Sequence, residues 1–392
     1  MMKAMTTGID KIIFMIAAAI LIIGCKKPYN PSLAKYKTGE LVVEGFINPG
    51  NDTTRFKLNR IVRLDTAVTA PVNNAQVIVE GADNSTYKLE GDTKGNYTAV
   101  LSLNNSQKYR LHIITTDNKN YVSDYVEVKI TPVIDALNYS IKNNGLQINL
   151  DTHDAANTTR YYRWDYIETW EFHSKYESTY YVINNDIQPR PLDKQIYYCY
   201  SSANSANVLL GSSAKLTQDV IAQAPVAFVP SSSEKIEVEY SVIVYQYALT
   251  SDAFNFWQNL KKNTEQLGSI FDAQPSEITG NIHCTTDPTE NVVGYISAST
   301  VQSKRIFVKN EMLPQSWKAT YPYDCEADSI FEDITIGGKS VNQVDQQIKG
   351  SGVFLPITKI NSLSHGQGYL ASSPICVDCT LRGTIIKPSF WQ

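Results

Sequence analysis

A long alternation of aromatic and polar residues constrains the fold of this chain more than any other feature. Between residues 161 and 183, most even positions carry aromatic rings as far as residue 172, and most odd positions are polar. A period of two places each set of side chains on one face of an extended strand, so the pattern predicts a β-strand. Because the stretch exceeds the usual strand length, we expect a bend or turn near Ser174.

The aromatic face of this strand has two interpretations. Its rings form a candidate surface for stacking on sugars or contacting a protein partner, and equally they supply the bulk that a buried sheet face needs. The candidate surface comprises Tyr162, Trp164, Tyr166, Trp170 and Phe172. Burial in the core is the favoured interpretation. Glu168, the one acid on this face, then needs an arginine partner, a place at the edge, or a sugar pocket to line.

An apolar run near the start of the chain indicates export. Residues 12–23 are continuously apolar and lead into Gly24 and Cys25. A membrane-spanning helix needs about 20 residues, so the run has the length of the apolar region of a signal peptide. We expect residues 1–24 to be a signal peptide ending in a lipobox, and Cys25 to be the lipidation site. The covalent lipid is the only cofactor expected, and two or more acyl chains would anchor the protein stably to a membrane.

Composition is typical of an exported β-protein that does not bind nucleic acid. The chain has 392 residues, 24 tyrosines and a net charge of −4. This length suggests two or three domains. Abundant tyrosine and β-branched residues favour strands, and the sequence has no cluster of lysine and arginine of the kind that binds nucleic acid.

Proline and turn patterns divide the first part of the chain. Residues 25–38 contain two prolines and few apolar residues, and we expect a tether there. Residues 39–131 carry short strand patterns at intervals of roughly ten residues, which predicts an immunoglobulin-like or prealbumin-like β-sandwich. Such a module would act as a spacer.

The rest of the chain is expected to form a larger β-rich unit. Residues 132–268 predict a second β-domain with a long central strand at 236–249 and one amphipathic helix at 251–267. Ser251 is the expected N-cap of that helix, with Gly268 just beyond its end. Residues 269–392 predict a loop-rich region, braced by disulfides and packed on the second domain.

Export makes disulfides permissible among the cysteines that follow Cys25. The favoured interpretation is disulfides among Cys284, Cys325, Cys376 and Cys379, in a pairing that sequence alone does not decide. Cys199 has strand-like surroundings and is expected to be a buried free thiol. Cys376 and Cys379 form a C-x-x-C motif. A redox role is disfavoured because the motif follows a loop, whereas a redox pair is expected at the start of a helix. A zinc site is disfavoured because an oxidising compartment disfavours free thiolates. No metal is expected.

The sequence contains none of the catalytic motifs that we sought. It lacks G-x-S-x-G and H-E-x-x-H, and residues 151–154 lack the ordered oxygen ligands of a calcium loop. We therefore expect a binding protein that is not an enzyme. An exported glycan-acting hydrolase with paired carboxylates is one alternative, and a structural or adhesion protein of the envelope is another.

The lipobox and five further stretches carry a resemblance to a known family; the stretches are residues 41–45, 240–260, 291–298, 376–383 and 387–391. In these parts the chain resembles the uncharacterised, domain-of-unknown-function lipoproteins of Bacteroidetes-type bacteria. It implies an outer-membrane accessory of a TonB-dependent receptor, acting in nutrient uptake with a glycan or peptide as the candidate ligand. It brings no catalytic residues. Lys26 and Lys27 stand where surface-exported members often carry acids, so the periplasmic and cell-surface faces both stay open.

Overall fold

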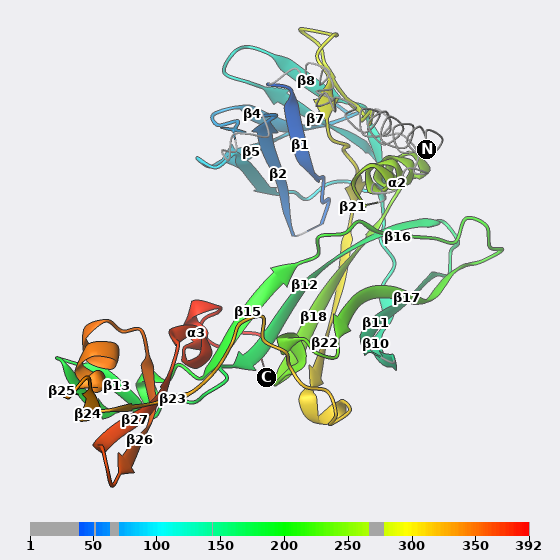
Figure 1. The fold of residues 1–392 in the computed structure, drawn as a ribbon. Helices are drawn as coiled ribbons and strands as arrows, with labels where there is room; N and C mark the ends of the chain where they lie inside the picture. The colour runs from blue at the N-terminus through cyan, green and yellow to red at the C-terminus, as the bar shows by residue number, and fades with distance from the viewer. Residues whose placement is uncertain (1–38, 51, 63–69, 143, 266–277, 392) are drawn as a thin grey trace, which may run out of the picture.

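Strands dominate the fold, as the sequence predicts. The computed structural model describes residues 39–50, 52–62, 70–142, 144–265 and 278–391. The signal peptide, the lipidation site Cys25 and the tether lie outside these residues. In the described part of the chain, no helix has the length and apolar character needed to cross a membrane. Three β-rich parts follow one another through the molecule: an N-terminal sandwich, a second domain and a distal lobe (Figure 1).

The N-terminal sandwich curls around a single core, to which its inward-facing side chains contribute. In β7, Tyr109, Leu111 and Ile113 are buried whereas Arg110 and His112 between them are not, which is the alternation of a half-buried strand. Neighbouring strands run in the order β19-β8-β7-β4-β5-β6-β2-β1-β20. The first nine strands are β1 (Leu41–Phe46), β2 (Thr53–Arg60), β3 (Ala70–Pro71), β4 (Gln76–Gly81), β5 (Thr86–Gly91), β6 (Asn96–Val100), β7 (Lys108–Ile114), β8 (Asn120–Ser123) and β9 (Val126–Lys129).

A later segment of the chain returns to complete this sandwich. The strands β19 (Ile282–Cys284), β20 (Val292–Val293) and β21 (Ala298–Ser299) pair with β8, β1 and β9. Their apolar side chains fill the edge of the N-terminal core. The expectation that residues 269–392 pack on the second domain was therefore wrong for residues 282–299. Short strands in a loop-rich sequence do not reveal a distant pairing partner.

The second domain is built from two sheets that share one core. One sheet has the order β10-β11-β17, and the other has the order β15-β12-β18-β22, with β16 also pairing to β12. Their bounds are β10 (Ile134–Lys142), β11 (Gly145–Asp154), β12 (Tyr161–His173), β15 (Tyr198–Asn204), β16 (Leu209–Ser212), β17 (Asp219–Pro230), β18 (Glu239–Ala248) and β22 (Val301–Lys309). The predicted strand ends at His173, next to the expected bend, and β18 is central as predicted.

The aromatic face of β12 lies in this shared core and not on the surface. Tyr162, Trp164, Trp170 and Phe172 are buried there, and Tyr166 is half-buried against it. These rings face side chains from β10, β11 and β17, so the candidate aromatic binding surface was wrong. Burial of these rings is favourable because the opposite sheet presents apolar side chains against which they pack.

Glu168 is buried among these rings and is paired. The Lys235 ammonium donates to one of its carboxylate oxygens, and the Tyr240 hydroxyl donates to the other at 2.7 Å. Lys235 comes from the short helix η2 (Glu234–Ile236), just before β18. Of the three expectations for Glu168, pairing with a cation is the one that the structure shows, with a lysine in place of the arginine. The lysine satisfies a carboxylate that would be costly to bury alone.

The predicted helix packs on the second domain as α2 (Ser251–Glu265). Its buried residues are Ala253 and Phe256, and it contacts β12 and β16. The side chain of Thr250 accepts a hydrogen bond from the Ala253 N–H at 3.2 Å, so Thr250, not Ser251, caps this end. Gly268 and the last two residues of the predicted helix lie outside the described residues.

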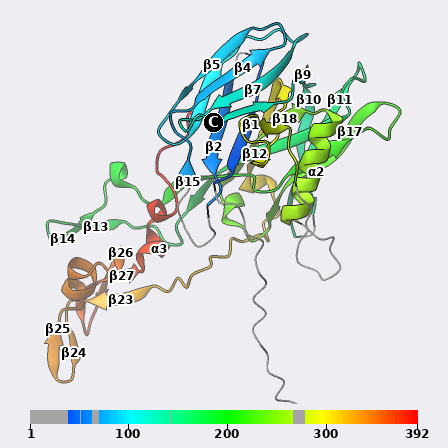
Figure 2. The ribbon, with the colours of Figure 1, turned by 90° about the horizontal axis from the view of Figure 1, so that it is seen from above.

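The distal lobe projects from the second domain on the side away from the sandwich (Figure 2). Two chain segments build it, one inserted between β12 and β15 and one near the C-terminus. Both contribute side chains to its small cores. Its elements are β13 (Tyr180–Ile183), β14 (Asp186–Pro189), β23 (Asp328–Phe331), β24 (Ile334–Ile336), β25 (Lys339–Val341), η4 (Val344–Gly350), β26 (Leu355–Ser362), β27 (Gly366–Ser372) and α3 (Pro374–Val377).

Asp154 at the end of β11 gives the second domain a predictable response to acid. It accepts hydrogen bonds from the Thr158 hydroxyl at 2.7 Å and from the backbone N–H groups of Ala156, Thr158 and Thr159. Burial acts in the opposite direction, but these bonds outweigh it and lower the pKa of Asp154 to about 2. The folded pKa lies below the unfolded value of about 3.9, so this stabilisation is present above that pH and is lost as the pH falls through the folded pKa.

We expect Asp154→Asn to destabilise the protein by about 1 kcal/mol at pH 7, because the uncharged amide accepts these bonds more weakly. The difference in the free energy of unfolding between the unaltered protein and Asp154→Asn should narrow between pH 4 and pH 2. Urea unfolding of the two proteins across that range measures this difference. A variant deficit that stays constant with pH would contradict the assignment.

Candidate functional site

Two disulfides join the C-terminal segment to earlier parts of the chain. Cys325 bonds to Cys376, and Cys199 bonds to Cys379. Cys284 is a buried free thiol in β19. The expectation of disulfides among the last four cysteines therefore differs from the structure at two positions: Cys199 is bonded and Cys284 is free. The reason is topological, because β15 brings Cys199 to the tail whereas β19 carries Cys284 into the N-terminal sandwich.

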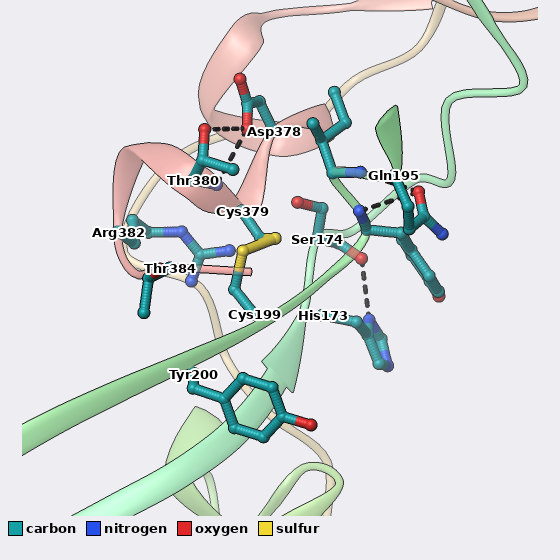
Figure 3. Close-up of a disulfide and its surroundings, with 12 residues drawn as sticks. His173, Ser174, Gln195, Cys199, Tyr200, Asp378, Cys379, Thr380, Arg382 and Thr384 are labelled. Carbon is teal, nitrogen blue, oxygen red and sulfur yellow. Dashed lines mark hydrogen bonds between the residues drawn. A yellow bond between two sulfur atoms is a disulfide. The ribbon is translucent and has the colours of Figure 1, made fainter. Parts of the chain in front are cut away.

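The bond between Cys199 and Cys379 fixes the tail on the second domain (Figure 3). Just beyond it, the backbones of Thr384 and Tyr200 exchange two hydrogen bonds of 2.7 and 2.9 Å. The buried Trp391 ring packs edge-on against Tyr200 and Phe307, with centroids 5.3 and 5.4 Å apart. The C-terminal segment is thus docked on β15 and β22 along its length.

The candidate site is a cavity at one end of the five-stranded sheet of the second domain. Because β12, β18 and β22 are antiparallel neighbours, the end of β12, the start of β18 and the end of β22 meet at one edge. The cavity there has a volume of about 400 Å³, within the range of small-molecule sites. It is lined by His173, Lys175, Ser231, Ser233, Ile236, Glu237, Asn310, Trp317, Lys318, Ala319 and Tyr321.

Glu237 is the most connected polar group of this cavity. Its carboxylate accepts a hydrogen bond from the Tyr321 hydroxyl and lies 3.6 Å from Nε2 of His173. Burial, together with this bond to Glu237, raises the pKa of Tyr321, so its hydroxyl stays a donor at neutral pH. The His173 ring stacks on Tyr197 with centroids 4.9 Å apart. Glu237, Tyr321 and His173 thus form one wall of the cavity, held in place by these contacts.

The docked tail supports this wall through Arg382. The Arg382 guanidinium pairs with Glu234 and lies over the rings of Tyr321, Tyr323 and Phe172, at 5.8, 5.4 and 4.6 Å from their centroids. Cation–π contacts of this kind favour the observed positions of the aromatic side chains. Because Arg382 follows Cys379 by three residues, the disulfide and the cavity wall are mechanically linked.

The chemistry of the lining suits polar recognition. A carboxylate, an imidazole, an amide and three hydroxyl side chains line the cavity and are of the kinds that bond to ligand hydroxyls, and Trp317 adds an aromatic surface. Among the described residues, no three histidine, cysteine or acidic side chains gather as a metal site. The expectation that the protein holds no metal stays a prediction.

Sequence reasoning did not single out this cavity. His173 and Glu237 belong to strand patterns whose lengths are visible in the sequence, but their proximity depends on register between distant strands. Trp317 and Tyr321 follow η3 (Asn310–Met312) in a segment without periodicity. Their only sequence signal is the presence of aromatic residues in a loop-rich region. The cysteine-rich tail was recognised, but its support of the cavity was not.

Comparison with known proteins identifies a family. Residues 26–305 match the model of a family described as a domain of unknown function (DUF4249). The match includes His173 and Glu237 and ends before Trp317. No curated protein matches the chain.

Several solved structures show distant similarity. A two-domain fibronectin type-III segment of chicken tenascin is 12% identical, covering 53% of this chain and 90% of that chain, with a TM-score of 0.17. A trypsin-activated α2-macroglobulin of Escherichia coli is 11% identical, covering 78% and 17%, with a TM-score of 0.19. A DUF3823 family protein of Parabacteroides merdae is 10% identical, covering 54% and 90%, with a TM-score of 0.13. At these TM-scores the likenesses carry nothing about function.

Proposed function

We propose that this chain, which belongs to the DUF4249 family of domains of unknown function, is a lipid-anchored binding protein of the bacterial outer membrane. In this proposal it does not catalyse a reaction and serves as an accessory of a TonB-dependent transporter in nutrient uptake. The observation that carries the binding role is the cavity at the sheet end, where a tryptophan lies among convergent hydrogen-bonding groups. Such a combination is typical of ligand pockets.

Anchoring is supported by the lipobox that ends at Cys25. Acyl chains on this residue would hold the chain at a membrane, and the N-terminal sandwich would be the part that follows the tether. The link to a TonB-dependent receptor is supported by the resemblance to Bacteroidetes-type lipoproteins.

Replacing Cys25 by alanine tests the anchor. We expect the variant to disappear from the outer-membrane fraction, because no acyl chain can be attached at that position. The unaltered protein should carry the mass of a diacylglycerol and further acylation at its N-terminus. Cys284→Ala, which removes a buried thiol elsewhere, is the matched control and should fractionate normally. An unchanged outer-membrane level of Cys25→Ala would refute lipid anchoring.

A further inference from the structure

Two lysines bring more positive charge to the cavity than its one acid, Glu237, offsets. Lys175 and Lys318 line the cavity, and neither takes part in an ion pair or hydrogen bond within the described residues. Both are exposed, so their ammonium groups are accessible from solvent. By contrast, Glu237 is already engaged by Tyr321 and lies beside His173. The unused charge in the cavity is therefore cationic.

The remaining lining is suited to a sugar ring. Trp317 is half-buried, packing on the core of the second domain and lining the cavity with its remaining surface. Aromatic side chains offer an apolar face with a polar handle, a combination that matches the alternating apolar and hydroxylated faces of a saccharide. Ser231, Ser233 and Asn310 add uncharged hydrogen-bonding groups around it.

We propose that this cavity binds an acidic saccharide. The sugar ring packs against Trp317, its carboxylate or sulfate is bound by Lys175 and Lys318, and its hydroxyls donate to Glu237. The inference rests on the proposed binding function and adds the ligand class. It follows from the coexistence of unpaired ammonium groups, an aromatic surface and a hydroxyl acceptor in one cavity of about 400 Å³.

The distinguishing experiment compares two probes that differ only in charge. Oligogalacturonate and the same oligomer with its carboxylates methyl-esterified are titrated calorimetrically into the full chain, purified in mild detergent. A polyglutamate peptide serves as the probe for charge without sugar. We expect oligogalacturonate to bind, with an affinity that falls as salt is added, because salt screens exposed charges. The two other probes should bind at least about tenfold more weakly, the factor expected from losing one charged hydrogen bond.

Lysine variants locate the binding to the cavity. Lys175→Ala combined with Lys318→Ala should weaken oligogalacturonate binding by about tenfold or more. The matched control is Lys215→Ala combined with Lys359→Ala, which removes two exposed lysines that do not line the cavity. Both double variants change only exposed residues, so both should fold.

Three results would overturn the inference: equal binding of the neutral oligosaccharide, equal binding of polyglutamate, or no binding of oligogalacturonate. Equal loss in the two double variants would also overturn it, since binding would then follow total charge. Release of new reducing ends from bound oligogalacturonate would uphold the ligand class but refute the non-catalytic part of the proposed function. None of these outcomes depends on whether a receptor accompanies the protein, so the two proposals fail separately.

Discussion

Replacing Cys199 and Cys379 together by alanine is expected to lower the free energy of unfolding of the second domain by about 5 kcal/mol. The two cysteines are separated by 180 residues. In the chain-entropy account, a cross-link that closes so long a loop removes many conformations from the unfolded chain. Cys325 and Cys376, separated by 51 residues, should contribute about 1 kcal/mol less on the same account.

Loss of this disulfide should also increase the mobility of the cavity wall. Arg382 follows Cys379 and lies over Tyr321, so release of the tail removes the cation that packs on this ring. We expect faster amide hydrogen exchange in β15 and around residues 317–323 of the variant. Urea unfolding monitored by tryptophan fluorescence measures the stability change. Cys284→Ala is the control, since that thiol is buried but forms no disulfide. An equal change in the control, or a cavity segment as protected as before, would contradict the account.

Replacing Lys235 by methionine is expected to destabilise the second domain by about 3 kcal/mol at pH 7. The change leaves Glu168 with a side chain only 7% exposed and without its cation. A carboxylate left unpaired in a core is costly, and the Tyr240 hydroxyl alone does not neutralise it.

A second substitution distinguishes lost pairing from lost packing. Adding Glu168→Gln to Lys235→Met should restore part of the stability, because the amide carries no charge to desolvate. Lys215→Met, at an exposed position of the same domain, is the control and should change stability by less than about 0.5 kcal/mol. Urea unfolding of the four proteins at pH 7 gives the comparison. If the double variant is no more stable than Lys235→Met, the pair is not what stabilises this region.

Local patterns in the sequence were enough to predict the elements that matter most. The alternation from Tyr161 predicts β12, the apolar strand after Ile236 predicts the central β18, and the spacing of Phe254 and Trp257 predicts α2. Each of these depends on the period of side chains within one element. Burial of the aromatic face was also the favoured expectation, because a ring-rich face is covered more readily than exposed.

Long-range pairing was not predictable. Cys199 meets Cys379 only because β15 lies at the edge of the sheet that receives the tail. In the same way, His173 and Glu237 meet because β12 and β18 are in antiparallel register. Register depends on burial over the whole sheet and not on any single strand. The cavity therefore becomes visible only once the sheets are assembled.

Co-purification of the tagged chain from its native envelope in mild detergent, with mass spectrometry of the accompanying proteins, tests the central proposal most directly. The account predicts a TonB-dependent outer-membrane receptor in stoichiometric amount. The Cys25→Ala variant should lose that receptor, because it is no longer held at the same membrane. Recovery of the chain alone, under conditions that keep other receptor complexes intact, would contradict the accessory role.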